Sequence, residues 1–137
     1  MRLALAPSSQ PDSFLAFDFG TRRVGVASGN TVTRHAAPLA TIELQGEARF
    51  AAIGRLIDEW QPTALVIGVP FHPDGAAHVN TQRSRRFARQ LQARFSLVVH
   101  EVDERYTTTE AKARGASDLD AAAAAIILEQ FLAAGDR

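Results

Sequence analysis

The chain contains 137 residues, 46% of them hydrophobic, which is enough to build one domain around a real core. Its 15 basic and 15 acidic residues balance, so no whole-protein charge drives it toward nucleic acid or a membrane, and such binding must come from local patches. The absence of cysteine excludes disulfides, thiolate metal sites and cysteine nucleophiles. No apolar run approaches the roughly 20 residues of a membrane span.

The two ends of the chain are predicted to lie outside the domain. Residues 1–13 hold one apolar patch, Leu3–Ala6, which is too short for the core of a signal peptide. We expect residues 1–13 to form a disordered leader, residues 14–134 to form a single domain, and residues 135–137 to be a C-terminal tail.

The first half of the domain is predicted to open with a meander of antiparallel strands at Phe14–Phe19, Arg23–Ser28 and Ala37–Ile42. From Gly46 to Trp60 the apolar residues recur at helical spacing, which predicts an amphipathic helix. Ala64–Val69 is a continuous apolar run, which is typical of a strand covered on both faces.

The second half alternates helices with one more strand. Val79–Phe95 carries apolar residues on one side and arginines on the other, which predicts a second amphipathic helix. We expect a buried strand at Ser96–Val102, a short helix at Thr107–Arg114 and an alanine-rich closing helix at Asp118–Ala134. The order βββαβαβαα predicts an α/β fold with a central mixed five-stranded sheet and helices on both faces.

Asp18 is a charge in the middle of an apolar, strand-like segment. An isolated ionised carboxylate is strongly disfavoured there unless it is paired, hydrogen-bonded or bound to a cation, so its presence indicates a metal or phosphate site. Gly20 can take the positive φ of a tight turn, and Gly25 leaves one face of the second strand open to close backbone approach. The alternative is a hairpin with an ordinary aspartate in its turn.

Further carboxylates follow the last strand and begin the closing helix. Asp103 and Glu104 lie at the strand end where open sheets bind ligands. Their side chains should alternate, so only one can readily face Asp18, and one residue of register exchanges them. Asp120 falls on the core-facing stripe of the closing helix, although with Ser117 it also resembles a capping box that needs no function.

Three such carboxylates indicate a metal-dependent hydrolase. Carboxylate oxygens are the hard ligands that Mg²⁺ or Mn²⁺ requires. Two such ions about 4 Å apart activate a water and stabilise the leaving oxygen in phosphodiester hydrolysis. The small side chains of Ala121–Ala125 would let the closing helix approach the sheet closely enough for Asp120 to reach the site, although alanine equally reflects helix propensity.

Arginine supplies 14 of the 15 basic residues. Guanidinium groups suit phosphates because they donate two parallel hydrogen bonds. The candidate nucleic-acid contacts are Arg22, Arg23, Arg85, Arg86, Arg89 and Arg105. The alternative is a solvated helix face, since isolated exposed charges usually signify little.

Motifs in a constant order connect the chain to a known family. They are Phe17–Ala27, Pro38–Leu39, Val66–Pro70, Asp74–Gly75, Arg86–Ala88, Asp103–Thr108, Asp120 and Ile126–Leu128. From about Phe14 to Leu132 the chain resembles the YqgF/RuvX family of Holliday-junction-resolvase-like proteins, which are regarded as pre-16S rRNA nucleases. The resemblance implies a ribonuclease H-like fold and a cytoplasmic bacterial endonuclease, with Asp18, Glu104 and Asp120 as the catalytic, metal-binding triad.

We therefore predict a metal-dependent endonuclease that uses two Mg²⁺ or Mn²⁺ ions to process the 5′ end of pre-16S rRNA. A resolvase of branched DNA and a noncatalytic nucleic-acid-binding assembly factor are the alternatives. A nucleotide-binding ATPase or kinase half is a further class, because Asp18–Thr21 also resembles a phosphate loop, but the chain has no second such motif. The expected partners are RNA or branched DNA, without a membrane, and the expected state is a monomer or homodimer.

Overall fold

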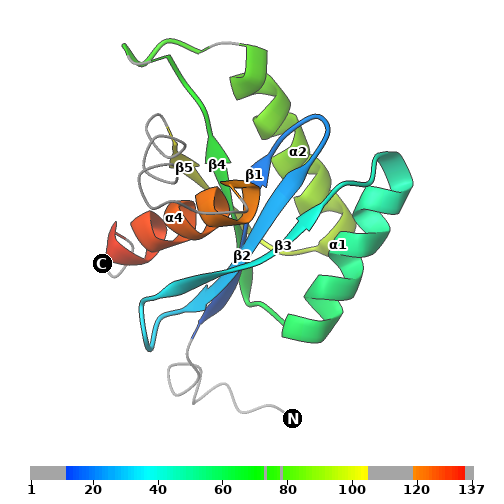
Figure 1. The fold of residues 1–137 in the computed structure, drawn as a ribbon, viewed down its shortest axis with the longest axis vertical. Coiled ribbons are helices and arrows are strands. Elements are labelled where there is room, and N and C mark those ends of the chain that lie inside the picture. The colour runs from blue at the N-terminus through cyan, green and yellow to red at the C-terminus, as the bar shows by residue number, and fades with distance from the viewer. Residues whose placement is uncertain (1–11, 73, 78, 105–118, 135–137) are drawn as a thin grey trace.

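The computed structural model describes residues 12–72, 74–77, 79–104 and 119–134. Within these ranges the elements, in chain order, are β1 (Ser13–Phe19), β2 (Val24–Asn30), β3 (Ala36–Ile42), α1 (Gly46–Trp60), β4 (Ala64–Val69), α2 (Val79–Phe95), β5 (Val99–Asp103) and α4 (Leu119–Ala134), as Figure 1 shows. The short helix predicted at Thr107–Arg114 falls outside the described residues, as do residues 1–11 of the predicted leader. None of the described helices is long and apolar enough to cross a membrane.

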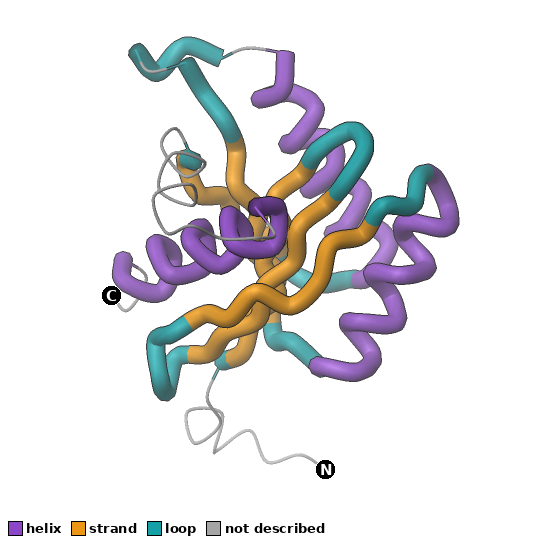
Figure 2. Tube along the Cα trace, viewed as in Figure 1, coloured by secondary structure: helices purple, strands orange, loops and turns teal. Residues whose placement is uncertain are grey.

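The five strands form one mixed sheet in the order β3-β2-β1-β4-β5. β1 pairs antiparallel with β2, and β2 pairs antiparallel with β3, so the predicted meander is confirmed. β4 lies parallel to β1 on its other side, and β5 lies parallel to β4. Because β1, β4 and β5 run in one direction, their carboxyl ends meet at the same edge of the sheet. Figure 2 shows the strands, in orange, and the helices around them, in purple.

Helices cover both faces of this sheet, as the sequence predicts (Figure 1). On one face, Phe17 of β1 packs in a cluster with Ile53 of α1 and Leu91 of α2. On the other face, Ala16 of β1 packs in a cluster with Ile127 of α4. Since strand side chains alternate, the odd-numbered residues of β1 face α1 and α2, and the even-numbered residues face α4.

The first turns of α4 lie directly against β2. The five alanines of Ala121–Ala125 are all buried. A Cβ atom added to Gly25 of β2 would overlap the carbonyl oxygen of Asp120. The expectation that Gly25 permits close backbone approach is therefore confirmed, and the approaching element is the alanine-rich start of α4.

The turn between β1 and β2 forms differently from the expectation. Gly20 does not take a positive φ; among the glycines that the structure describes, Gly46 and Gly75 do. Glycine is needed at position 20 for a steric reason instead. A Cβ atom there would lie 2.6 Å from the carbonyl oxygen of Arg23, on the other side of the turn.

Two further expectations are wrong at element ends. The last strand begins at Val99 rather than Ser96, because Ser96 takes a left-handed φ of 55° and donates its backbone N–H to Gln92, which ends α2. The amphipathic pattern over Gly46–Trp60 places Trp60 on the buried face of α1, but Trp60 is 43% exposed. It is the last residue of the helix, and Gln61 turns the chain away in a left-handed conformation.

Replacing Gly25 with alanine should destabilise the fold, because the new methyl group would push α4 away from β2. We expect the free energy of unfolding to fall by more than about 2 kcal/mol, as for other overpacked sites. Urea denaturation followed by circular dichroism measures this change.

Gly46→Ala is the matched control, since it adds the same atom where no atom other than its chain neighbours and the backbone of its own helix lies within 4 Å. Its φ of 58° makes alanine strained, which should cost about 1 kcal/mol. Equal losses for the two variants would contradict the close contact between β2 and α4.

Candidate active site

The carboxyl groups of Asp18 and Glu104 meet on the α4 face of the sheet. Asp18 is the last residue but one of β1, and Glu104 directly follows β5. Their side chains share a hydrogen bond across the intervening strand β4. Gly68 of β4 makes this contact possible, because a Cβ atom there would overlap Oε1 of Glu104 and the side chain of Ile127. The role of Gly68 was not foreseen from the sequence, although a glycine inside an apolar strand signals such a close approach.

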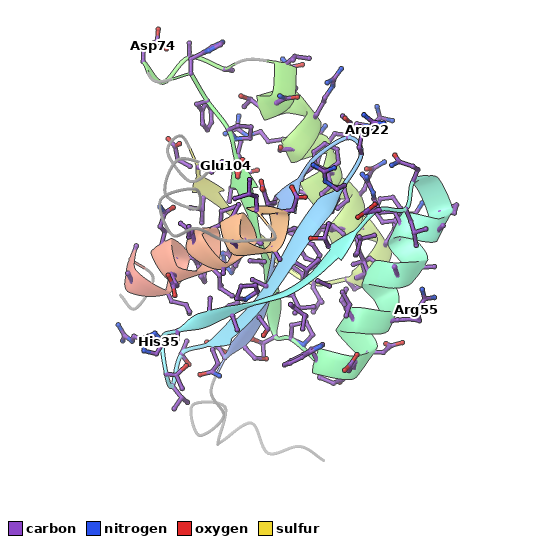
Figure 3. The ribbon with its side chains drawn as sticks, in the orientation of Figure 1. Arg22, His35, Arg55, Asp74 and Glu104 are labelled. Atoms are coloured by element: carbon purple, nitrogen blue, oxygen red, sulfur yellow. The ribbon has the colours of Figure 1, made fainter. Side chains whose placement is uncertain are left out.

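The sequence leaves open whether Asp103 or Glu104 faces Asp18, and the geometry at the end of β5 shows that Glu104 does. The backbone N–H of Glu104 donates to the carbonyl oxygen of Val69 at 3.2 Å, which continues the pairing with β4 by one residue. The Glu104 side chain is partly buried and turns toward Asp18, whereas Asp103 is exposed. Figure 3 shows Glu104 beside the beginning of α4.

The shared hydrogen bond changes the protonation of both groups. Burial, together with the nearby charge of Asp18 and the hydrogen bond to it, raises the pKa of Glu104 to about 9. Burial also raises the pKa of Asp18, to about 6, while the hydrogen bond from Glu104 opposes this rise. Near neutral pH, Glu104 is therefore the protonated donor and Asp18 is the ionised acceptor.

One oxygen of this pair has no hydrogen-bond partner. Oε1 of Glu104 is buried, and it is the one buried side-chain oxygen or nitrogen without a partner among the described residues. An unpartnered buried oxygen is costly, so a bound cation or donor at this position would be stabilising.

Asp120 lies near the pair but has a partner of its own. Its charge contributes to raising the pKa of Asp18, which places it within electrostatic range. Its Oδ2 accepts a hydrogen bond from Nε of Arg23 at 2.7 Å, and this ion pair was not foreseen from the sequence. No group of three or more His, Cys, Asp or Glu side chains among the described residues lies close enough to hold a metal ion. The suggested capping partner of Asp120, Ser117, falls outside the described residues.

The arginines proposed from the sequence divide between several places. Arg22 is exposed at the turn between β1 and β2, where Figure 3 shows it, and Arg23 binds Asp120 across the same end of the sheet. Arg105 falls outside the described residues. Of these two described arginines, Arg23 contacts a carboxylate directly.

The remaining three arginines lie on two sides of α2. Arg85 donates to Glu101 of β5 at 3.2 Å and lies over the ring of Phe71 at 5.4 Å. Arg89 is exposed. Arg86 lies on another side of α2, in a groove beside the turn between β1 and β2. The helix α2 thus presents Arg85 toward β5 and Arg86 toward the turn between β1 and β2, at the end of the sheet that holds the carboxylates.

Known proteins resemble this chain along most of its length. The RuvX family, described as Holliday junction resolvase, matches residues 12–134. A protein of Polaromonas sp. (strain JS666) named "Putative pre-16S rRNA nuclease" is 62% identical over 134 residues, which cover 96% of this chain and 97% of that protein. A protein of the same name from Albidiferax ferrireducens is 67% identical over 120 residues, which cover 88% and 77% respectively.

The solved structures support the fold. Thermus thermophilus RuvC in complex with a Holliday junction substrate superimposes with a TM-score of 0.59 at 14% identity, covering 89% of this chain and 94% of RuvC. At this identity the likeness concerns the fold alone, and it confirms the predicted ribonuclease H-like architecture. With a family match over residues 12–134 and relatives above 60% identity, the chain belongs to the RuvX family of Holliday-junction-resolvase-like proteins.

Proposed function

We propose that this protein is a metal-dependent endonuclease that hydrolyses phosphodiester bonds at the 5′ end of pre-16S rRNA, during ribosome biogenesis in the cytoplasm. The observation that carries the proposal is the pair of Asp18 and Glu104, with its shared hydrogen bond and the unpartnered buried oxygen. The names of the relatives support pre-16S rRNA as the substrate.

The chemistry of the pair fits a divalent cation. When Glu104 loses its proton, two adjacent carboxylates carry two negative charges in a partly buried position, and hard oxygen ligands of this kind bind Mg²⁺ or Mn²⁺. A bound divalent cation would supply activation of water and stabilisation of the leaving oxygen. We propose Asp18, Glu104 and Asp120 as catalytic metal ligands for two such ions. Asp120 would have to exchange its contact with Arg23 in order to ligate a cation.

The neighbouring residues position these carboxylates. Gly68 leaves the space into which Glu104 reaches, and Gly25 lets the backbone of Asp120 lie against β2. Arg23 pairs with Asp120 and partly neutralises it, which limits the repulsion between the carboxylates while no cation is bound.

We also propose that arginines bind the phosphates of the substrate. These arginines are the exposed Arg22, Arg23, Arg85, Arg86 and Arg89, together with Arg105, which falls outside the described residues. Phosphate contacts fix the register of a strand without reading its bases, so their loss should weaken RNA and DNA binding alike.

Branched DNA is the second candidate substrate. The description of the family names Holliday junction resolvase, and the RuvC structure of similar fold contains a Holliday junction. Both substrates are cut by the same phosphodiester chemistry, so the carboxylate pair alone does not distinguish them.

Asp18→Asn and Glu104→Gln should each abolish cleavage that depends on Mn²⁺ or Mg²⁺. Each substitution removes a ligand charge while keeping the side-chain shape, so we expect a loss on the order of 100-fold or more. The measurement is cleavage of a 5′ leader of pre-16S rRNA beside a four-way DNA junction, resolved on denaturing gels.

Asp58→Asn is the matched control, because Asp58 is an exposed carboxylate of α1 on the other face of the sheet. It should cleave like the wild type. Loss of activity in this control alone, or full activity in both site variants, would refute the assignment. No cleavage by a folded wild type that binds RNA would instead indicate a noncatalytic assembly factor.

The stability of the metal-free protein should fall as pH rises from about 5 to about 8. The folded state holds a proton on Glu104, whose pKa is raised to about 9 from 4.5, while the unfolded state has lost it. The unfolded state then binds fewer protons, so the free energy of unfolding decreases by up to about 1.4 kcal/mol per pH unit for this proton. Urea denaturation in a chelator measures the slope.

Glu104→Gln should flatten this dependence, because the amide stays neutral at every pH. Adding Mn²⁺ should stabilise the wild type more at about pH 8 than at about pH 6, since the cation competes with the proton of Glu104. Parallel pH profiles for wild type and variant would show that the pair does not share a proton.

A further inference from the structure

A groove of about 330 Å³ lies at the same end of the sheet as the carboxylates but on the opposite face. It is bounded by Thr21 of the turn between β1 and β2, by the first turn of α1 and by α2. Three arginines, Arg49, Arg83 and Arg86, line it, and the described residues that line it include no Asp or Glu. Its lining is therefore suited to an anion.

Arg49 forms a cationic floor for this groove. Its side chain is only 6% exposed, and it donates Nε to the carbonyl of Leu44 at 2.9 Å and Nη2 to the carbonyl of Thr21 at 3.1 Å. Its guanidinium also lies 5.6 Å from the ring centre of Phe19. Among the described residues no carboxylate pairs with Arg49, so a buried positive charge is held in place by neutral groups alone.

The start of α1 adds to the positive potential. Gly46, the first residue of the helix, lines the groove. The preceding residue, Gln45, makes no side-chain capping hydrogen bond, and its amide instead donates to the carbonyl of Arg22 at 2.9 Å. The first N–H groups of a helix carry partial positive charge, which favours a bound anion.

Arg83 and Arg86 supply exposed cations at the rim of the groove. They are three residues apart on α2, so they share one face of the helix, and both are exposed. Arg83 donates to the amide oxygen of Asn80 at 3.4 Å. No carboxylate partner is found for either arginine in the part of the chain that the structure describes, so both charges remain available to an anion.

The groove and the carboxylates are joined through consecutive residues of β1. Asp18 faces α4, and Phe19 faces the groove, because successive side chains of a strand point to opposite faces. The turn that follows, with Arg22 exposed on it, separates the two sites. A strand of nucleic acid that crosses this turn would reach both of them.

We infer that the groove binds a backbone phosphate of the nucleic acid substrate. On the substrate strand, this phosphate lies a short distance from the phosphodiester that is presented to Asp18 and Glu104. This inference rests on the proposed function, since it assumes that the occupant is a nucleic acid strand. It assigns Arg49, Arg83 and Arg86 to one phosphate subsite and separates them from Arg85, which is paired with Glu101.

The test is binding of a fluorescently labelled single-stranded RNA leader to the full chain, measured by anisotropy in a chelator at several salt concentrations. The double variant Arg83→Gln/Arg86→Gln should bind about tenfold more weakly, and its salt slope should fall by about 0.7 to 1.4, as expected for one or two lost phosphate contacts. Both side chains are exposed, so the fold should be retained, which thermal unfolding checks.

The matched control is Arg34→Gln/Arg55→Gln, which makes the same change in net charge at exposed positions away from the groove; Figure 3 shows Arg55 on α1. It should keep the affinity and the salt slope of the wild type. Equal weakening by both double variants, or no weakening by Arg83→Gln/Arg86→Gln, would overturn the inference. Because binding is measured without metal, weakening confined to the groove variant supports the subsite even if the wild type cleaves neither RNA nor DNA.

Discussion

Two carboxyl groups that share one hydrogen bond across β4 set the main constraint on this structure. Asp18 and Glu104 can meet only if the strand between them lacks a side chain at the crossing point, and Gly68 meets this condition. Burial raises the pKa of both groups, and the charge of Asp18 adds to the rise at Glu104, so the pair holds a proton near neutral pH. A divalent cation would compete with that proton for the same oxygens. The burial of these two acids is thereby linked to the proposed metal-dependent hydrolysis.

Successive side chains of β1 point to opposite faces of the sheet, so the end of this strand borders an acidic site on one face and a cationic groove on the other. Asp18 contributes negative charge to the α4 face, and the next residue, Phe19, lies on a face where Arg49 is buried without a carboxylate partner among the described residues. A nuclease needs acidic groups for the reaction and cations for the substrate, and close mixing of the two would neutralise both. The turn between β1 and β2 separates the acidic groups from the cations of the groove. The ion pair of Arg23 with Asp120 is the exception, because it joins a cation to one of the acids.

Elements with strong periodicity were predictable to the residue. The helices at Gly46–Trp60 and Val79–Phe95 and the strand at Ala64–Val69 have the expected bounds, because each has a single pattern of apolar residues that one structure satisfies. The start of β5 was not predictable, since the apolar residues Leu97 and Val98 suit a strand but follow the left-handed turn at Ser96. Such a turn depends on where α2 must end, which local composition does not encode.

The sequence by itself determined the kind of site: a charge inside the apolar strand β1, further acids after the last strand and at the start of the closing helix, and glycines that admit close contacts. Only the tertiary structure decided that Glu104 rather than Asp103 meets Asp18, that Arg23 pairs with Asp120, and that Arg49 is buried. The physical reason is that strand register and helix approach depend on contacts between segments far apart in the chain. A shift of one residue in register would exchange the two faces of β5 without changing its composition.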